Sequence, residues 1–353
     1  MIMKKLLVRS CFFLLSMCMF VACGSDDDDS KSGKSYDDVV EIYDNGSTSN
    51  GTHYTPINDK SFYLDYVLYT IVDAHLEVAG HDKIASNGIV NIVSSIKLKG
   101  ARYDVLRVRG RAFENCTDIR TLAIPKSVTE IGKSAFQGCS GLTSIKVDEE
   151  NTVYDSRDNC NAVILKSTHT LVVGCENTKI PNGVKSIGYG AFYNCYGLTA
   201  ITIPSSVEVI GGETFDGCTN LTSVHISDLE AWCKIKIYYS SPLSYAHHLF
   251  LNGKEIKDLI IPNSVTSIGQ CAFMDCSSLT SVTIPNSVKT IGIGAFNGCS
   301  SVKDVYCYID DPLSNSGFSI KESNFITLHV PAASIDEYKS KNPWSDFYSI
   351  VAL

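Results

Sequence analysis

The sequence predicts a repeat solenoid, mainly β, and three observations predict this fold class. Within each repeat, apolar and polar residues alternate with the period of a half-buried strand. The cysteines within each pair of repeats are 23 residues apart, and spacings of 79 and 81 residues relate successive pairs. Such self-similarity is typical of a chain that stacks equivalent coils. A five-residue segment ending in cysteine recurs six times, at Ala112–Cys116, Ala135–Cys139, Ala191–Cys195, Thr214–Cys218, Ala272–Cys276 and Ala295–Cys299.

Residues 1–22 are predicted to be a lipoprotein signal peptide. Three basic residues precede an apolar run at 11–22, which is shorter than the roughly 20 residues needed to span a bilayer. Small residues then stand directly before Cys23, a pattern that resembles the lipobox of bacterial lipoproteins, with Phe20 where leucine is usual. The resemblance implies that Cys23 is lipidated and becomes the first residue of the mature chain. The alternative is a plain secretory peptide that is cut near Ala22.

Residues 23–52 are predicted to be an acidic, flexible tether. Ser25 and the four aspartates 26–29 open a stretch rich in Ser, Gly, Asp and Asn, which cannot bury enough apolar surface to fold. The run resembles the export signal that sends lipoproteins of gut- and mouth-dwelling Gram-negative bacteria to the outer face of the outer membrane. This resemblance implies a lipid-anchored protein facing the cell exterior, and the alternative is a tether without a targeting role.

Residues 53–99 do not fit the repeat. The segment Phe62–Val72 is aromatic and β-branched, which predicts strand. We therefore expect a β-rich N-terminal cap that covers the first coil of the solenoid.

The repeat occupies residues 100–330 and is clearest in one unit. In Leu198–Pro204 the isoleucines alternate with threonine, and the proline ends the strand because it cannot donate a ladder hydrogen bond. A second short strand is expected at Val207–Ile210. Two glycines then turn the chain into a helical turn that places Phe215 and Cys218 inside.

This unit resembles the leucine-rich repeat of the BspA-like branch, which reads IPxSVxxIGxxAFxxCxxL. The match is close over 203–221, 261–279 and 284–302, with Thr214 in place of the usual alanine. The resemblance implies a leucine-rich-repeat-like solenoid that acts as a surface protein in adhesion to host or neighbouring-cell proteins.

Two insertions and a C-terminal cap complete the domain prediction. The insertions lie near 149–174 and 227–258, and each is expected to contain a hairpin, the second turning at Asn252–Gly253. Residues 331–353 are expected to form the C-terminal cap. Its short helix begins with a capping box of Ser334 and Glu337 and stops before Pro343, after which three apolar residues close the last coil: Trp344, Phe347 and Ile350.

The six repeat cysteines are expected to be reduced core residues. They recur at one position of the unit, where cysteine acts as a small apolar side chain beside the phenylalanines. The alternative is a set of disulfides in an exported protein, formed among the remaining cysteines of the domain: Cys160, Cys175, Cys233, Cys271 and Cys307.

Composition and motifs argue against several function classes. The net charge of −8 lacks the basic excess that nucleic-acid binding requires. The sequence has no CxxC, HExxH or GxSxG motif and no complete phosphate or dinucleotide loop. We therefore expect no metal, no cofactor and no catalytic residue, and membrane contact only through the lipid anchor.

The remaining expectation is binding through the surface of the solenoid. The outward positions of the main strands are predicted to be Ala123, Lys146, Thr202, His225, Thr283 and Tyr306, joined by Thr143, Thr199, Thr222 and Thr280. Of these, the candidate binding residues are Thr202, His225, Thr283 and Tyr306. A second candidate group in the second insertion is Trp232, Tyr238, Tyr239 and Tyr245. The alternatives are ordinary strand solvation for the first group and local core for the second.

The predicted function is a cell-surface lipoprotein that binds or adheres to a protein partner, such as a host matrix protein or a surface protein of a neighbouring cell. Two alternatives remain open at this point. One is a glycan-binding accessory protein, and the other is a structural envelope protein without a specific ligand.

Overall fold

The computed structural model describes residues 39–43, 46–82, 88–239, 241–313, 317–318 and 325–353. The predicted signal peptide, Cys23 and the aspartate run lie outside the described residues. Within the described part, no helix combines the length and the apolar character needed to cross a bilayer.

The described chain begins with a strand inside the predicted tether range. Strand β1 (Val39–Ile42) pairs in parallel with β7 (Ser95–Leu98), and Val40 and Ile42 are buried. The prediction for 23–52 differs here because the run Val-Val-Glu-Ile has the alternation and the β-branched residues of a strand, which the surrounding polar composition masked.

The N-terminal sheet has eight strands in the order β1-β7-β8-β5-β4-β3-β2, with β10 also paired to β8. Strand β8 pairs in parallel with β5 on one side and with β10 on the other, so it joins this sheet to the first coils of the repeat. The further strands of the sheet are β2 (Tyr54–Pro56), β3 (Ser61–Leu64), β4 (Val67–Val72), β5 (His75–His81), β8 (Ala101–Val108) and β10 (Glu130–Ile131).

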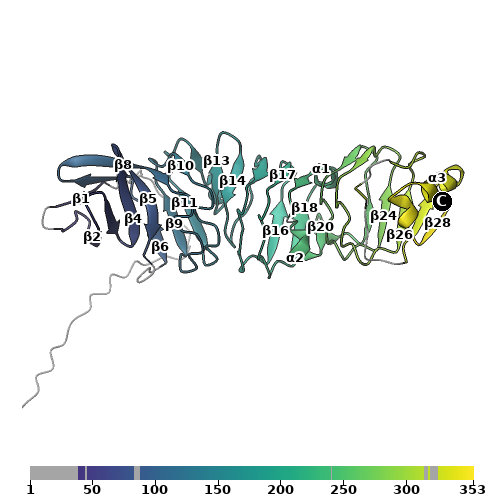
Figure 1. The fold of residues 1–353 in the computed structure, drawn as a ribbon, viewed down its shortest axis with the longest axis horizontal. Helices are drawn as coiled ribbons and strands as arrows, with labels where there is room; N and C mark the ends of the chain where they lie inside the picture. The colour runs from purple at the N-terminus through teal and green to yellow at the C-terminus, as the bar shows by residue number, and fades with distance from the viewer. Residues whose placement is uncertain (1–38, 44–45, 83–87, 240, 314–316, 319–324) are drawn as a thin grey trace, which may run out of the picture. The chain divides into compact units, whose positions relative to one another are not determined.

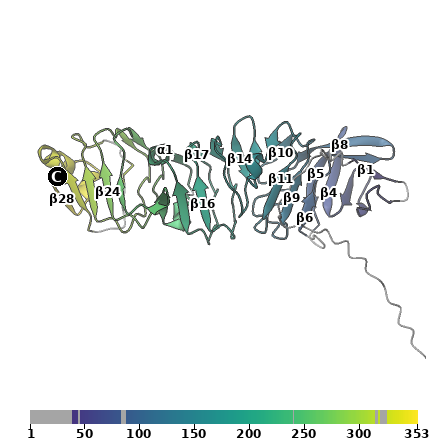
Figure 2. The same ribbon diagram turned by 180° about the vertical axis from the view of Figure 1, so that it is seen from behind.

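The structure confirms the predicted fold class, a mainly β solenoid (Figure 1). We call one repeat of main strand, second strand and turn segment a coil. The main strands form three sheets that are parallel except for the hairpin strand β21, and they follow one another from purple to yellow in Figures 1 and 2. They are β6 (Ile89–Asn91), β9 (Thr121–Ile124) and β11 (Ser144–Val147); β16 (Ala200–Ile203), β18 (Ser223–Ile226), β20 (Leu249–Leu251) and β21 (Lys254–Glu255); and β22 (Asp258–Ile260), β24 (Ser281–Ile284), β26 (Asp304–Cys307), β27 (Thr327–Val330) and β28 (Ser349–Ala352).

The second strands form a further layer. Beyond β10, they are β15 (Ser186–Ile187), β17 (Val209–Ile210), β19 (Lys236–Ile237), β23 (Ser267–Ile268) and β25 (Thr290–Ile291). The turn segments that follow are turns rather than a regular helix, and they also bond from coil to coil. For example, the backbone N–H groups of Phe113 and Phe273 each donate to the alanine carbonyl of the next coil at 2.8 Å.

The repeat phenylalanines are buried, but they stack in pairs. The ring centroids are 5.1 Å apart for Phe113 and Phe136, and the two rings are nearly parallel. The two later pairs show the same geometry: Phe192 with Phe215 at 5.3 Å, and Phe273 with Phe296 at 5.4 Å. The first pair belongs to the N-terminal core cluster and the other two to the C-terminal one, so the interior is not one unbroken row of rings.

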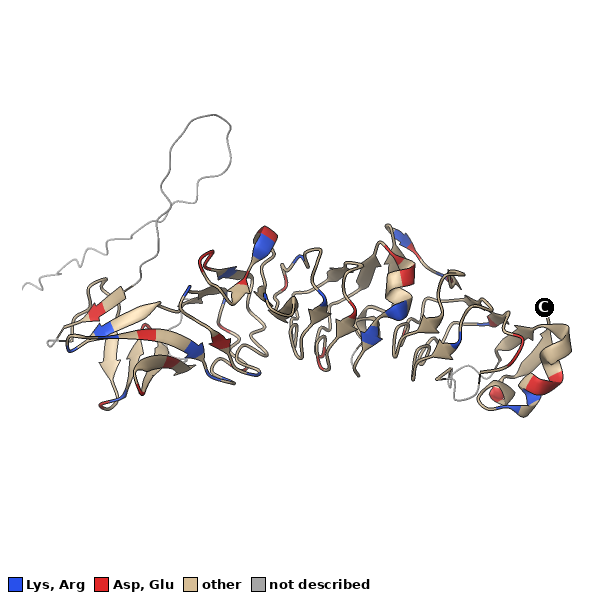
Figure 3. Ribbon diagram, turned by 90° about the horizontal axis from the view of Figure 1, so that it is seen from above, with Lys and Arg blue, Asp and Glu red and all other residues tan. Residues whose placement is uncertain are grey.

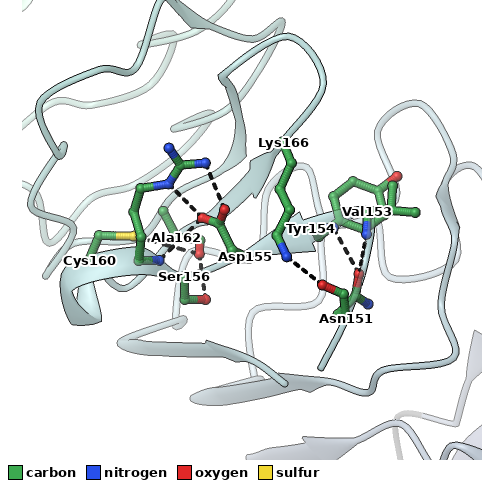
Figure 4. Close-up of polar contacts among 9 residues, drawn as sticks. Asn151, Val153, Tyr154, Asp155, Ser156, Cys160, Ala162 and Lys166 are labelled. Carbon is green, nitrogen blue, oxygen red and sulfur yellow. Dashed lines mark hydrogen bonds and ion pairs between the residues drawn. The ribbon is translucent and has the colours of Figure 1, made fainter. Parts of the chain in front are cut away.

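The first insertion lies where these two clusters meet and contributes buried residues to both. Strands β13 (Val163–Leu165) and β14 (Thr170–Val173) form the expected antiparallel hairpin, which also pairs with β12 (Tyr154–Asp155). The buried Asn151 holds the insertion to the preceding coil, and Figure 4 shows its contacts with Val153 and Tyr154 inside the insertion. Its Nδ2 donates to the carbonyls of Pro125 and Val128, and its Oδ1 accepts from the N–H groups of two following residues, Val153 and Tyr154.

The second insertion contains the predicted hairpin and two unpredicted helices. Strands β20 and β21 are antiparallel around Asn252–Gly253, both of which have positive φ. Helix α1 (Leu229–Lys234) is capped by Asp228, whose side chain accepts from Ala231 N at 3.0 Å, and helix α2 (Leu243–Ala246) follows. A six-residue helix and a four-residue helix are too short to show an apolar period in sequence.

The last coil is closed by α3 (Ile335–Ser340) and by Trp344, which is fully buried and stacks on Phe318 at 5.2 Å. The predicted capping box does not form. The 3₁₀ turn at Ala332–Ser334 runs directly into the helix, so Ser334 has a helical backbone and its side chain caps nothing.

Candidate functional site

The candidate site is the outward face of the main sheets, where neighbouring strands place equivalent residues side by side. In the N-terminal three-stranded sheet the register aligns Asn91, Ala123 and Lys146. In the middle sheet it aligns Thr202, His225 and Phe250. We call these sets the N-terminal row and the middle row. The predicted residues Thr202 and His225 therefore lie in adjacent strands.

The C-terminal row is the longest and the most apolar. It consists of five residues on five parallel strands: Ile260, Thr283, Tyr306, His329 and Val351. The rings of Tyr306 and His329 stack with centroids 4.5 Å apart and an interplanar angle of 17°. The side chain of Ile260 is 65% exposed, which is unusual for a large aliphatic residue on a strand.

Further exposed aromatic residues flank this row. Phe325 precedes β27 and Tyr348 precedes β28, and their rings meet edge to face at 5.3 Å. Both side chains are at least 70% exposed. Tyr308 directly follows β26 and is also exposed. The C-terminal sheet thus carries apolar surface along its row and beyond both ends of its strands.

Polar contacts fix the orientation of these side chains. His329 Nε2 lies 3.0 Å from Asp304 Oδ1, so the carboxylate holds the ring over Tyr306. At the other end of the sheet, Asp258 accepts hydrogen bonds from Ser281 and Thr280, and these bonds lower the pKa of the Asp258 carboxyl. The row is therefore oriented before any partner binds.

The middle row is smaller. The rings of His225 and Phe250 stack at 4.9 Å, and His225 Nε2 lies 3.0 Å from Ser223 Oγ. The hairpin of β20 and β21 ends this sheet, so Thr202 and His225 belong to a different sheet from Thr283 and Tyr306. The four candidate binding residues therefore divide into two rows.

The aromatic group of the second insertion does not form one surface. Trp232 is only 2% exposed because α1 turns it into the core together with Cys233. Tyr245 is partly buried, and its hydroxyl accepts from Gly217 N at 2.9 Å. Only Tyr238 and Tyr239 are exposed, and they follow the second strand β19.

Three of the outward threonines are structural ties. The hydroxyls of Thr143 and Thr222 each donate to a backbone carbonyl of the preceding coil at 3.1 Å, and the Thr280 hydroxyl is shared between Asp258 Oδ1 at 2.9 Å and Lys257 O at 3.2 Å. These hydrogen bonds stabilise the stack, so the hydroxyl hydrogens are not available to a binding partner.

Four residues of the middle and C-terminal rows were not predicted from the sequence: Phe250, Ile260, His329 and Val351. The signal for two of them was present, because Ile260, Thr283, Tyr306 and His329 follow one another at 23-residue intervals. Extending the interval past the last clear repeat would have found His329. Phe250 and Val351 break the interval, and only the strand register places them.

The eleven cysteines between Cys116 and Cys307 are all buried, and none of them forms a disulfide in the structure. Three repeat cysteines, Cys139, Cys218 and Cys299, direct Sγ to the phenylalanine carbonyl of the preceding coil at 3.1 Å. Burial raises the pKa of most of these thiols, to about 12 at Cys218. A thiol held neutral in this way is a poor nucleophile and a poor metal ligand.

Charged residues are distributed along the described part of the chain. Figure 3 shows basic and acidic segments interspersed along the ribbon. Among the described residues, no three His, Cys, Asp or Glu side chains are grouped so that they could hold a metal ion. The middle and C-terminal rows therefore stand out by their aromatic and aliphatic content rather than by charge.

Comparison with known proteins identifies the repeat. The family model described as BspA type leucine rich repeat region matches in six copies, over residues 91–169, 162–247 and 243–338. No curated protein matches the chain.

Several solved structures are similar to this chain. The pneumococcal vaccine antigen PcpA is 18% identical over 72% of this chain and 60% of its own, with a TM-score of 0.45. A leucine rich cell surface protein of Faecalibacterium prausnitzii is 20% identical over 84% of this chain and 95% of its own, with a TM-score of 0.39. A leucine-rich repeat protein of Bacteroides ovatus is 21% identical over 83% of this chain and 76% of its own, with a TM-score of 0.38. Because the family model spans well over half of the sequence, this chain belongs to the BspA-type leucine-rich repeat family.

Proposed function

We propose that this chain is a surface lipoprotein that binds a protein partner through the outward face of its C-terminal sheet. The observation that carries the proposal is the C-terminal row, in which parallel strands align Ile260, Tyr306, His329 and Val351. Exposed apolar side chains gain free energy when a partner removes them from water. Tyrosine rings are common anchors of protein interfaces because they bury a large area at a small entropic cost.

The chemistry of this face favours a protein over a glycan. Ile260, Phe325 and Val351 have no hydrogen-bonding group to offer the hydroxyls of a sugar. The middle of a protein interface, in contrast, is poor in charge and rich in aromatic and apolar groups. A host matrix protein or a surface protein of a neighbouring cell is the class of partner proposed.

Binding of the purified full chain to an array of extracellular-matrix proteins tests this function. We expect the double variant Ile260→Ala, Tyr306→Ala to bind at least ~30-fold more weakly, because hot-spot residues contribute about 2 kcal/mol or more. The matched control is Lys146→Ala in the N-terminal row, which should bind as the wild type does. Equal losses in both variants, or binding to polysaccharide alone, would contradict the proposal.

The proposed location is the outer face of the outer membrane, through lipidation of Cys23. The sequence before Cys23 and the aspartate run after it support this part of the proposal. Cells fed a labelled fatty acid should incorporate label into the wild type and none into Cys23→Ser. Protease added to intact cells should remove the wild-type domain. Label in Cys23→Ser, or a protected domain, would argue against it.

A further inference from the structure

A polar groove of about 430 Å³ opens on the turn face of the solenoid, away from the main sheets. Its origin is a shortened coil. In the flanking coils the phenylalanine follows the isoleucine of the second strand by five positions, as in Ile131 to Phe136 and Ile187 to Phe192. In the coil between them, Gly174 follows Leu171 by only three positions. Gly174 takes the place of the phenylalanine, because its N–H donates to the alanine carbonyl of the next coil, Ala191 O, at 2.8 Å, as the N–H of Phe113 does to Ala135 O.

The short coil therefore contributes no projecting turn. A side chain at Gly174 would collide with the Phe192 ring, which fills the space left by the missing phenylalanine. The turn segments on the two sides of the short coil then face each other across the groove. Two contacts join residues that are 56 and 76 positions apart in the sequence. Lys133 Nζ lies 4.5 Å from the centre of the Tyr189 ring, and Gln137 Nε2 lies 3.4 Å from Glu213 Oε2.

The first wall carries Arg111, Glu114, Lys133 and Gln137. Arg111 and Glu114 form an exposed ion pair with 3.7 Å between Nε and Oε2. This wall therefore offers a guanidinium, an ammonium, a carboxylate and an amide within one turn segment and its neighbour.

The second wall carries Tyr189, Tyr193 and Glu213. Glu213 accepts a hydrogen bond from the Tyr189 hydroxyl, and this bond is the main reason why the pKa of Tyr189 is raised. Tyr189 is exposed and Glu213 is half-buried. Aromatic rings combined with a few placed polar groups are found in pockets that bind small ligands.

The charges of the groove balance, with two basic groups and two acidic groups. It has no net attraction for an anion or for a cation. Its backbone offers no free strand edge to a peptide, because the N–H groups of Arg111 and Gly190 already bond to the carbonyls of the next coil. What it does present are forked polar groups, which bind pairs of hydroxyls, and tyrosine rings, which pack against C–H faces.

We propose that this groove binds a neutral saccharide, with Tyr189 as the stacking platform and with Gln137 and Glu213 as hydrogen-bonding groups for the sugar hydroxyls. The site lies on a different face from the C-terminal row, so it goes beyond the function proposed above. The protein then has a protein-binding face and a separate sugar-binding groove.

Isothermal titration of the full chain with neutral gluco-, manno-, galacto- and xylo-oligosaccharides of two to six units tests this site. We expect at least one series to bind, with affinity reduced ~10-fold or more in Tyr189→Ala and in Glu213→Gln. The matched control is Ile293→Ala, since Ile293 is an exposed residue at the position of Tyr189 in another coil. A thermal melt of each variant separates loss of binding from loss of fold.

Saccharide binding that is lost in both groove variants and kept in Ile293→Ala supports the site. Failure of every neutral series to bind overturns it, and so does equal binding by the groove variants. Binding of acidic oligogalacturonides or of charged tetrapeptides in place of neutral sugars also overturns it. The variant Ile260→Ala, Tyr306→Ala should bind the sugar normally, so this result and failure of the protein-binding proposal are distinguishable.

Discussion

Asn151 shows how one buried polar side chain can hold an insertion in place. Both donors of its amide and both lone pairs of its oxygen are used within the structure. Nothing in the sequence separates this asparagine from its many solvated neighbours, because its role depends on carbonyls 23 and 26 residues earlier. Trp232 shows the opposite case, since its residue type suggested a binding surface while a short helix places it in the core.

At the residue scale, the strongest prediction contrasts an inward residue with an outward one of the same coil. Phe215 is fully buried and stacks on Phe192, whereas the Thr222 side chain is exposed and makes one hydrogen bond to Thr199 O. We expect Phe215→Ala to lower the free energy of unfolding by about 3–5 kcal/mol and Thr222→Ala by about 1 kcal/mol or less. Urea denaturation measures both. Similar losses in the two variants would show that the inward and outward positions are wrongly assigned.

At the scale of elements, the repeat predicted the main and second strands of its clear copies, and the insertions themselves predicted both hairpins, because each has a local signal. Alternation marks the strands, and Asn252–Gly253 marks a turn that needs two residues with positive φ. The capping box at Ser334 failed because a 3₁₀ turn preceded the helix. The breaks between the three main sheets were not predictable, since they depend on how each insertion packs and not on the repeat.

The buried cysteines predict how stability changes with pH. Burial raises the pKa to about 12 at Cys218 and Cys233 and to about 11 at Cys160 and Cys276, from 9.0. In the unfolded chain these thiols ionise near pH 9, so above that pH the unfolded state binds fewer protons than the folded state. Their contribution to stability is complete below pH 9 and is lost as the pH rises toward 11 to 12, by about 1.4 kcal/mol per pH unit for each thiol.

Urea midpoints measured at pH 8, 9.5 and 10.5 check this dependence. The wild type should lose stability steadily across the series. The Cys218→Ala variant should lose less stability over the same pH interval, because one titrating thiol is absent, even if its urea midpoint at pH 8 is lower than that of the wild type. If the urea midpoints of the two proteins fall equally with pH, Cys218 is not held neutral by burial.

At the scale of the whole molecule, the described unit is a stack in which each coil covers the apolar flank of the next. The fold class followed from the sequence because stacking requires the same residue types at the same positions. The candidate site followed only in part. Thr283 and Tyr306 were predicted from the repeat, but the length of the C-terminal row depends on β27 and β28, whose sequences have left the repeat motif. The groove depends on the short coil at Gly174, which differs from the other coils mainly because it has no phenylalanine.

The C-terminal row and the packing of the interior both depend on the strand register. Engineered cysteine pairs on the exposed face measure this register most directly. Tyr306 and His329 are paired across β26 and β27, while Val351 lies one strand further along the row. Neighbouring strands lie about 4.8 Å apart, which suits a disulfide, whereas two strands away the distance of about 10 Å does not. Under mild oxidation, Tyr306→Cys, His329→Cys should cross-link and Tyr306→Cys, Val351→Cys should not. A cross-link in the second pair and none in the first would contradict the stacked register.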